Sequence, residues 1–440
     1  MVAGVTNLRN FTEIWRQSAF IPLPDYTTML KHRSNKLKII NDPVYGFINI
    51  PDESIFDLIE SPQVQRLRNI KQLGLTHLVY PGAIHTRFQH ALGAMYLMGQ
   101  AIHVLRQKGN AISSEEALAL RQAILLHDIG HGPFSHALEG LLIQGINHEQ
   151  LTGLFMKKMN KLASFNLETA INIFKNTHPN KALHQLVSGQ LDMDRLDYLN
   201  RDSFFTGVSE GVVGWDRIIE MLNIRNQQLV IDEKGIYSIE KFLVARRLMF
   251  WQVYLHKTVL AAENMLKSII RRAKYLMVNG TTLPATPSLE RFLKNHYTLK
   301  NFEVDSTLLE DFAMIDDYDI YTAIKIWSQS AESVLRNLCS NFTKRNLYRI
   351  EVQKLPFEKE YVEQIRKKTG NYYKIGPEEV DYFVIEGTTV NNAYDPDCPS
   401  IMVMGRDGSL TDITQASDQL NLKALANPVE KHFLCYSKDL

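Results

Sequence analysis

Cysteine is scarce in this sequence, and neither sign of charge dominates. The 440 residues contain three cysteines, Cys339, Cys398 and Cys435, which are widely spaced and form no CxxC pair. So few dispersed thiols favour a reduced, cytoplasmic setting. The formal net charge is +1, so nothing in the composition demands a nucleic-acid partner, and any basic surface must be local.

Long hydrophobic runs are also missing. No apolar stretch reaches the length that crosses a membrane, and residues 1–30 lack a basic segment followed by an apolar one. We therefore expect neither a membrane partner nor a secretory signal. The sequence has no internal repeat, P-loop, GxGxxG fingerprint or low-complexity tract. The chemistry must be sought in other motifs.

What remains is an ordinary globular composition, 45% hydrophobic and 22% charged. Its patterns predict a mainly α fold, with a helical core and a small C-terminal α+β lobe. Four parts are expected: an N-terminal arm over 1–35, the helical core over 36–280, a helical extension over 281–345 and the α+β lobe over 346–440.

Hydrophobic periodicity places the elements of these parts. Helices are expected at about 53–59, 62–73, 84–107, 114–127, 134–144, 148–158, 166–175, 181–188, 193–200, 215–223, 238–278, 288–296, 305–313, 318–338 and 358–368. Alternating patterns predict a strand over 36–48 that runs into a turn, a hairpin of 228–231 with 235–237, and strands at 347–352, 382–385, 401–404 and 432–436.

The densest chemistry lies in residues 127–136, which hold three histidines and one aspartate. An apolar run over 123–126 leads into this segment, and Ser113 with Glu116 predicts a capping box at the start of the helix that carries the run. Two glycines and a proline then break the helix. The helix should therefore deliver His127 and Asp128 from a buried interior.

An adjacent His-Asp pair offers an imidazole nitrogen and a carboxylate oxygen at one point, which suits a divalent metal. The alternative is a histidine-rich helix end whose side chains satisfy carbonyls and the helix dipole. Three histidines beside an aspartate, between an apolar run and glycines, favour the metal. Two further ligands must come from elsewhere, upstream at His90 and downstream in the acidic run 192–202.

The order H…HD…D resembles that of the HD-domain metal-dependent phosphohydrolases. Many ordered motifs resemble, more closely, the deoxynucleoside triphosphate triphosphohydrolases (dNTPases) of the SAM-and-HD-domain type. The resemblance is dense from about Lys36 to Lys257 and thins over the C-terminal third. The arm is too short for the SAM domain of some members. The motifs are Asp42-Pro43, Ser61-Pro62-Gln63, Gln65-Arg66-Leu67-Arg68, Ile70-Lys71-Gln72-Leu73-Gly74, Pro81-Gly82-Ala83, Arg87-Phe88, His127-Asp128, residues 130–136 and His148-Glu149-Gln150.

On this resemblance we assign the metal to His90, His127, Asp128 and Asp194. Two imidazoles and two carboxylates suit iron, manganese or zinc, with magnesium as a companion of the nucleotide. The metal would act as a Lewis acid on the α-phosphate.

The resemblance also implies catalytic and phosphate-binding histidines at His131, His136 and His148. We expect His136 to protonate the leaving 5′ oxygen, with Glu139, three residues on along a second helix from about Phe134, orienting it. Members of the family often carry Asp at the position of Glu139.

A substrate shell follows from the same resemblance. Arginines would bind phosphate, and other residues would meet the sugar, its 3′-hydroxyl and the wall that excludes a 2′-hydroxyl. Two departures are Arg195 for the usual lysine and Phe250 where some members have histidine. The implied substrate-binding residues are Gln72, Leu73, Arg87, Arg195, Tyr198, Asp202, Arg246 and Tyr254.

The resemblance further implies activation by GTP or a dNTP between subunits of a homotetramer. The alternative is that these side chains are ordinary surface charges of a helical oligomer. The implied allosteric residues are Lys38, Asn41, Glu60, Gln65 and Arg68 for the guanine nucleotide, and His256 and Lys257 near a second activator.

The expected function is therefore a metal-dependent dNTPase that releases deoxynucleoside and triphosphate. One alternative is another HD phosphohydrolase, acting on a nucleoside monophosphate, a cyclic nucleotide or an alarmone. Another is a nucleotide- or nucleic-acid-binding protein in which catalysis is secondary, although no basic, aromatic-interleaved tract supports nucleic-acid binding.

Overall fold

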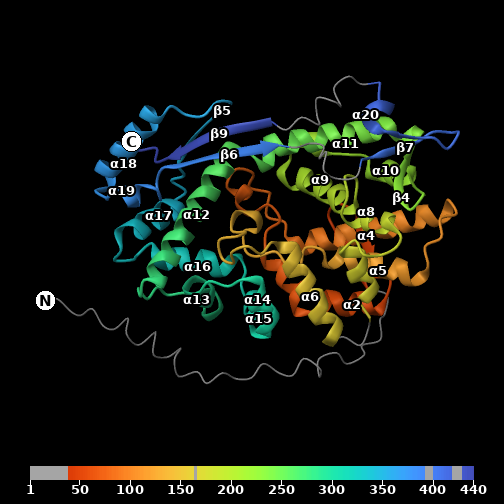
Figure 1. Cartoon of the computed structure of the whole chain (residues 1–440), viewed down its shortest axis with the longest axis horizontal. Helices are drawn as coiled ribbons and strands as arrows, with labels where there is room; N and C mark the ends of the chain where they lie inside the picture. The colour runs from red at the N-terminus through yellow and green to blue at the C-terminus, as the bar shows by residue number, and fades with distance from the viewer. Residues whose placement is uncertain (1–37, 163–165, 392–399, 419–428) are drawn as a thin grey trace. The chain divides into compact units, whose positions relative to one another are not determined.

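The computed structural model describes residues 38–162, 166–391, 400–418 and 429–440. The predicted N-terminal arm, 1–35, lies outside these residues, as does Cys398. The fold is mainly helical with small sheets, as the sequence predicts (Figure 1). The boundaries predicted at 280 and 345 remain predictions.

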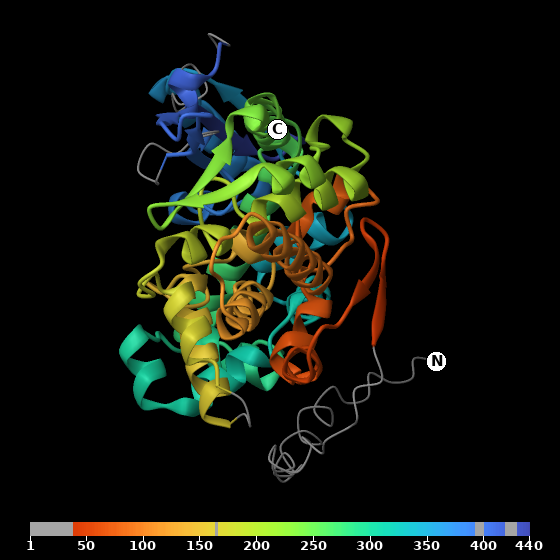
Figure 2. The same cartoon turned by 90° about the vertical axis from the view of Figure 1, so that its right-hand side faces the viewer.

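The first half of the chain is almost entirely helical, after a β1–β2 hairpin that is drawn in red in Figure 2. Its elements are β1 (Ile39–Asp42), β2 (Gly46–Asn49), α2 (Glu53–Glu60), α3 (Pro62–Gln65), the 3-10 turns η2 (Arg66–Asn69) and η3 (Gly74–Leu78), α4 (Arg87–Gln107), α5 (Ser114–Leu126), the 3-10 turn η4 (Ser135–Ala137), α6 (His148–Leu162), α7 (Glu168–Phe174), α8 (Lys181–Val187) and α9 (Met193–Thr206).

The second half adds helices and short strands. Its elements are η5 (Ser209–Gly211), α10 (Trp215–Met221), β3 (Leu222–Arg225), β4 (Gln228–Asp232), η6 (Glu233–Gly235), α11 (Ile236–Met249), the π turn η7 (Phe250–Tyr254), α12 (Lys257–Val278), α13 (Pro287–Lys294), α14 (Leu299–Val304), α15 (Ser306–Ala313), α16 (Asp317–Trp327), α17 (Ser333–Thr343), β5 (Arg349–Gln353), α18 (Lys359–Tyr373), α19 (Pro377–Val380), β6 (Ile385–Asn391), β7 (Met402–Met404), β8 (Leu410–Asp412), α20 (Ile413–Ala416) and β9 (Val429–Tyr436).

Helix α4 lies at the centre of the core, in contact with both α5 and α9. Apolar side chains around most of its circumference are buried, which explains why it has no clear polar face. The capping box that begins α5 is confirmed, because the Ser113 hydroxyl accepts from the Glu116 N–H and the Glu116 carboxylate accepts from the Ser113 N–H. The capping box therefore fixes where this helix starts.

The helix predicted over 134–144 is wrong. Only the single 3-10 turn η4 forms there, because Phe134 and Ser135 adopt left-handed backbone angles, with φ of 52° and 47°. A left-handed residue cannot continue a right-handed helix. The prediction that His136 and Glu139 share one face of a helix is therefore also wrong, because no α-helix forms there.

The single helix predicted over 238–278 is also wrong. The chain forms α11, passes through η7 and restarts as α12, whose first turn is capped by the His256 side chain. A π turn inserts an extra residue into the helical ladder and commonly marks functional sites. Here it carries Tyr254, one of the residues expected at the substrate.

The hairpin predicted from 228–231 and 235–237 is wrong in its second strand. The strand at 228–231 forms, but it pairs with another segment. β4 pairs antiparallel with the preceding β3, across a two-residue turn in which Asn226 and Gln227 have φ of 51° and 59°. Such a turn matches the twist of paired strands. Gly235 instead ends the 3-10 turn η6, and residues 236–237 begin α11.

Three smaller expectations also fail at helix ends. The helix at 62–73 is shortened to α3, which continues as the 3-10 turn η2. The helix at 318–338 divides into α16 and α17, because the Glu332 carboxylate caps a new start by accepting from the Val334 and Leu335 N–H groups at 3.1 and 2.6 Å. α14 was not anticipated.

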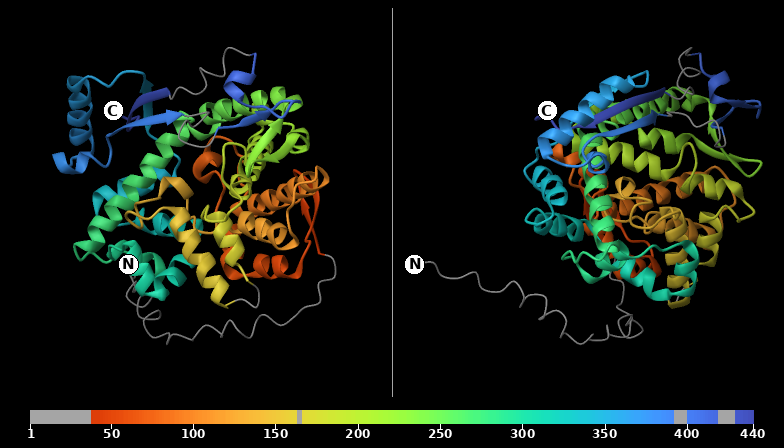
Figure 3. Two further views of the ribbon diagram at one scale, coloured as in Figure 1. Left: turned by 45° about the vertical axis from the view of Figure 1, so that its right-hand side comes forward. Right: turned by 60° about the vertical axis from the view of Figure 1, so that its left-hand side comes forward.

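The C-terminal strands form two sheets. β9 pairs antiparallel with both β5 and β6, whereas β7 leaves this sheet and adds in parallel to β4, more than 150 residues earlier in the chain. Figure 3 shows blue C-terminal strands in both sheets. The small α+β lobe therefore also completes the sheet that follows the helical core.

Among the described residues, no helix is both long and apolar enough to cross a membrane.

Candidate metal centre

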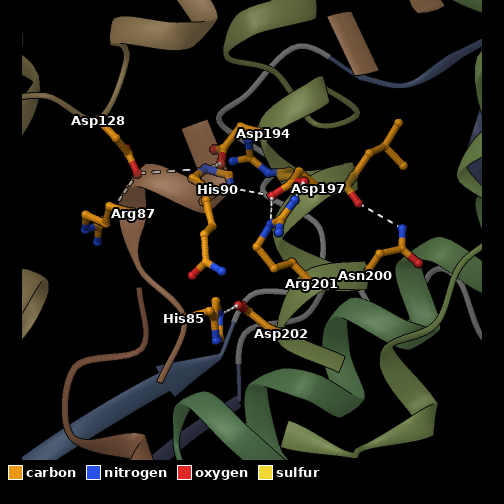
Figure 4. Close-up of polar contacts among 12 residues, drawn as sticks. His85, Arg87, His90, Asp128, Asp194, Asp197, Asn200, Arg201 and Asp202 are labelled. Carbon is orange, nitrogen blue, oxygen red and sulfur yellow. Dashed lines mark hydrogen bonds and ion pairs between the residues drawn. The ribbon is translucent and has the colours of Figure 1, made fainter. Parts of the chain in front are cut away.

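Three helices bring the predicted ligands together. His90 lies on the first turns of α4, His127 ends α5, and Asp194 lies in the first turn of α9. Their ligand atoms form a cluster within which every pair is closer than 4.8 Å. Figure 4 shows His90 and Asp194 side by side at this point.

The spacing of these atoms fits a shared cation. His90 Nε2 lies 3.0 Å from Asp194 Oδ1, His127 Nε2 lies 3.5 Å from the same oxygen, and the two Nε2 atoms are 3.4 Å apart. Ligand atoms about 2.1 Å from one cation lie about 3.0–3.4 Å from each other in octahedral or tetrahedral arrangements. Two imidazole nitrogens and a carboxylate are donors that many divalent metals accept.

Each imidazole is also held in the tautomer that a metal needs. His90 Nδ1 donates to Asp197 Oδ2 at 2.7 Å, and His127 Nδ1 donates to the Ile124 carbonyl at 2.6 Å. Both Nε2 atoms are therefore left to face the cluster. Second partners of this kind orient metal-binding histidines and raise their basicity.

Asp128, the fourth predicted ligand, lies at the edge of the cluster. Its Oδ1 is 3.3 Å from His127 Nε2, and its Oδ2 is 3.8 Å from His90 Nε2. Oδ2 also accepts from Arg87 Nη1, which fixes the carboxylate from the opposite side. Its place in the metal shell stays a prediction.

A buried charged network, which the sequence analysis did not assign to the site, supports His90. Asp197 accepts from Arg201 Nε and Nη2, each at 2.9 Å, and Arg201 Nη1 donates to Asp42 Oδ2 at 2.7 Å (Figure 4). All three side chains are buried, at 8% exposure or less. The available signal was the spacing of Asp197 and Arg201, four apart on the helix that carries Asp194.

The electrostatics of the cluster follow from burial and pairing. Burial opposes the charged form of His90, but hydrogen bonds to Asp194 and Asp197 outweigh it and raise the pKa of His90 to about 10. Burial likewise opposes the Asp194 carboxylate, yet the two histidines lower its pKa below the ordinary value. The carboxylates are thus kept ionised, and a bound cation would displace the second proton that His90 holds in the metal-free cluster.

Gly93 leaves the space in which this network forms. A Cβ at this position would lie 2.0 Å from Asp197 Oδ1 and 2.1 Å from Arg201 Nη2, so any larger residue must displace the pair. We expect Gly93→Ala to weaken metal binding by about 10–100-fold, the usual cost of disturbing a ligand's hydrogen-bond partner.

Gly99→Ala is the matched control for that prediction, because it makes the same change in the same helix. Its Cβ would meet Arg121 at an ordinary 3.6 Å. Calorimetric titration with Mn²⁺ compares the two variants with the unaltered chain. Equal affinities of Gly93→Ala and Gly99→Ala would contradict the role assigned to the network.

The predicted catalytic histidines adjoin the metal cluster. His131 Nε2 lies 3.4 Å from Asp128 Oδ1, and the His131 and His148 rings stack with centroids 3.9 Å apart. Burial and the nearby Arg87 hold the pKa of His131 well below its usual value. The side chain of His136 lies outside the described residues.

Glu139 contacts His148. Its Oε1 accepts from both the ring Nδ1 and the backbone N–H of His148, each at 2.8 Å. The expected orientation of His136 by Glu139 stays a prediction.

The residues expected around the sugar form one connected group. Asp202 accepts from Tyr254 Oη at 2.8 Å and from His85 Nε2 at 2.7 Å. The Tyr198 and Tyr254 rings meet edge to face with centroids 6.1 Å apart. His85, which the sequence analysis did not single out, is buried and stacks on Phe205.

Several polar atoms in this region are buried without a hydrogen-bond partner: Gln72 Oε1, His85 Nδ1, Arg195 Nε and Arg246 Nε. Such orphans are rare in folded proteins and indicate a missing ligand or water. Arg246 and Arg195 both lie near enough to Tyr198 to oppose the rise in its pKa that burial causes. Leu73, half-buried, follows Gln72 in the chain.

The predicted allosteric residues lie outside this region. Lys38, Asn41, Glu60 and Arg68 are exposed, while Gln65 bridges the Ile59 carbonyl and Arg68 Nε. The Arg68 guanidinium lies 3.7 Å from the centroid of the Phe88 ring. Phe88 directly follows Arg87 in the chain. His256 and exposed Lys257 stand at the start of α12.

Comparisons with known proteins agree with this geometry. The HD domain model matches residues 87–202, which span all four predicted metal ligands, and the HD associated region model matches residues 213–286. A crystal structure of a phosphohydrolase from Bacteroides thetaiotaomicron is 50% identical, with a TM-score of 0.88, and the match covers 92% of this chain and all of that one.

Two curated proteins extend the comparison. An uncharacterized protein of Bacillus subtilis, YwfO, is 35% identical over 71% of this chain and 71% of its own length. The deoxynucleoside triphosphate triphosphohydrolase SAMHD1 homolog of Dictyostelium discoideum is 31% identical over 54% of this chain, which spans only 49% of that protein. With the histidine and aspartate cluster as its centre, this chain belongs to the HD-domain phosphohydrolases, a family of metal-dependent hydrolases.

Proposed function

We propose that this protein is a dNTP triphosphohydrolase, which adds water across the bond between the 5′ oxygen and the α-phosphorus and releases deoxynucleoside and triphosphate. The observation that carries the proposal is one face of α9. Asp194, Tyr198 and Asp202 follow at steps of four, so they line one side of the helix. A metal ligand, an aromatic ring and a sugar-binding carboxylate are thereby placed in a row.

Each end of that row has partners suited to one part of a nucleotide. At the metal end, Arg87 holds Asp128, and the partner-free Nε atoms of Arg195 and Arg246 suit phosphate oxygens. At the other end, the Asp202 carboxylate and the unpaired Gln72 Oε1 are acceptors for a sugar hydroxyl. The relatives named as dNTP triphosphohydrolases support the same substrate.

A divalent metal held by His90, His127 and Asp194, with Asp128 beside them, would supply Lewis-acid chemistry at the α-phosphate. The chain itself performs the remaining tasks. His136 stays the proposed proton donor to the leaving oxygen. Glu139 holds the His148 ring in place, and His148 in turn stacks on His131. Iron, manganese or zinc all fit this donor set.

The test is a product analysis by anion exchange. With manganese present, each dNTP should yield deoxynucleoside and intact triphosphate, and Asp128→Ala should remove that activity. Ribonucleotides should be poor substrates because Leu73 is the proposed wall against a 2′-hydroxyl. No triphosphate from any dNTP mixture, with the metal site intact, would contradict the proposal and favour a nucleoside monophosphate, cyclic nucleotide or alarmone as substrate.

We also propose nucleotide regulation, in a homotetramer, at Lys38, Asn41, Glu60, Gln65 and Arg68, with His256 and Lys257 at a second site. The support is the stacking of Arg68 on Phe88, which links the exposed surface to the helix turn that carries Arg87. GTP added to the product assay should raise the rate, and Arg68→Ala should remove that response. A rate independent of GTP and of added dNTP mixtures would contradict regulation.

A cytoplasmic location is proposed on the dispersed cysteines, of which Cys339 and Cys435 are free and buried.

A further inference from the structure

A buried carboxylate in the helical extension joins two loops of the proposed active site. Asp317, in the first turn of α16, is fully buried. Its Oδ1 accepts from the backbone N–H of Phe134 at 2.8 Å, and its Oδ2 accepts from the backbone N–H of Lys71 at 3.0 Å. The Lys71 ammonium lies 3.7 Å from the same Oδ2.

These two N–H groups belong to segments with distinct proposed tasks. Phe134 follows His131 in the histidine segment 131–135, and Lys71 precedes Gln72 in the sugar-facing segment 71–74. The segments also touch, because a Cβ on Gly74 would lie 3.7 Å from the Phe134 carbonyl oxygen. Asp317 therefore ties together two neighbouring segments of the chain.

The histidine segment needs such an anchor. Phe134 and Ser135 are two consecutive non-glycine residues with positive φ, a conformation that is sterically unfavourable for L-amino acids. Phe134, the first of the two, donates its backbone N–H to Asp317. An unfavourable backbone persists only where its surroundings hold it.

Other contacts between the helical extension and the two segments act in the same direction. Arg66 donates from Nε to the Ile315 carbonyl at 3.0 Å and from Nη2 to the His131 carbonyl at 2.9 Å. Tyr321, on α16, packs edge to face on Phe134, and the Lys71 ammonium lies 5.5 Å from the centroid of the Tyr321 ring. The start of α16 thus reaches both segments by independent routes.

A carboxylate is a costly choice for a purely structural contact. Burying an ionised group is strongly unfavourable unless it is paired and fully hydrogen-bonded. Asp317 meets these conditions only while both segments and Lys71 are in place. Asp319 in the same turn is only half-buried, and its carboxylate closes the capping box of α16 by accepting from the Asp316 N–H.

We propose that Asp317 is a positioning residue for hydrolysis, which fixes the catalytic histidine segment and the sugar-facing segment to one carboxylate. It touches neither substrate nor metal and acts through His131 and Gln72. The proposal rests on the proposed function for the tasks of the two segments. The clamp, by which we mean the two hydrogen bonds that Asp317 accepts from Phe134 and Lys71, is itself a property of the fold.

The experiment compares Asp317→Asn with Asp319→Asn in the full chain. An asparagine keeps one acceptor oxygen, so one of the two N–H groups would face an amide NH2 instead. Hydrogen exchange followed by mass spectrometry should show faster exchange in Asp317→Asn for peptides covering 69–76, 128–138 or both. The kcat should fall by about 10–100-fold, since small misplacements of catalytic groups are costly, while bound metal stays equal.

Asp319→Asn should leave both peptides and kcat unchanged, because the Asp319 carboxylate accepts from the Asp316 N–H and the Thr286 hydroxyl, which both lie outside the two segments. Unchanged exchange in Asp317→Asn would overturn the clamp. Faster exchange with an unchanged kcat and KM would overturn the catalytic role. Should Asp317→Asn not fold, Asp317→Glu keeps the charge, displaces the oxygens and carries the same readouts.

Failure of the proposed function is distinguishable from failure of the clamp. If the unaltered chain cleaves no dNTP, the dNTPase proposal falls, while the exchange comparison still decides the clamp. The kcat comparison then uses bis(p-nitrophenyl) phosphate with manganese.

Discussion

Replacing Asp194 by asparagine is expected to lower hydrolysis by about 1,000-fold or more, the loss of several kcal/mol of metal-derived stabilisation. Asp194 Oδ1 is the atom that both His90 Nε2 and His127 Nε2 approach, at 3.0 and 3.5 Å. An amide has nearly the same size but no charge, so the metal loses its carboxylate while the packing of α9 is retained.

Metal content measured by mass spectrometry should fall together with activity in this variant. Asp381→Asn serves as the control, because Asp381 is half exposed and pairs with Arg366 away from the cluster; its metal content and rate should match those of the unaltered chain. Asp194→Asn with full metal content and full activity would remove Asp194 from the metal centre.

The second large effect concerns stability rather than chemistry. Arg201→Met is expected to lower the free energy of unfolding by about 3–5 kcal/mol, the cost of removing one partner from a buried ion pair. Arg201 has no exposed surface, and its loss would leave the carboxylates of Asp42 and Asp197 without their cation. Methionine fills most of the volume, so the effect is one of charge.

Urea unfolding followed by circular dichroism measures this loss. Arg366→Met provides the comparison, because its pair with Asp381 is partly exposed to solvent, and exposed pairs contribute about 1 kcal/mol or less. Similar midpoints for the two variants would show that the buried network does not stabilise the fold. Because Asp197 also holds the His90 ring, Arg201→Met should weaken Mn²⁺ binding as well.

The sequence was most informative where chemistry depends on residues close together in the chain. The capping box of Ser113 and Glu116, the apolar run and the His127-Asp128 pair predicted both the end of α5 and its ligands. His90 and Asp194 required the family order, yet the structure brings both to the same point. The metal cluster was therefore largely predictable.

Contacts between distant residues were not predictable in this way. Asp42 and Arg201 are separated by 159 residues, and Phe134 and Asp317 by 183. No periodicity links such positions, and a single buried acid looks like any other helix residue. The site's supporting network was therefore found only in three dimensions.

Backbone irregularity was the other source of error. The sequence Phe134-Ser135 does not predict left-handed backbone angles, because neither residue type favours a positive φ. The π turn at Phe250–Tyr254 lies inside an unbroken helical pattern, and only tertiary packing selects it over a continuous helix. Both irregular segments lie at the proposed active site, where local preference commonly yields to function.

The parallel pairing of β7 with β4 has a practical consequence for anyone who shortens this chain. β4 is an inner strand, with β3 on one side and β7 on the other. A fragment ending before Ser400 would keep the whole metal cluster but expose a row of unpaired backbone groups along β4. Open strand edges recruit other chains, so a truncated catalytic fragment should aggregate, because β7 no longer covers this edge of β4.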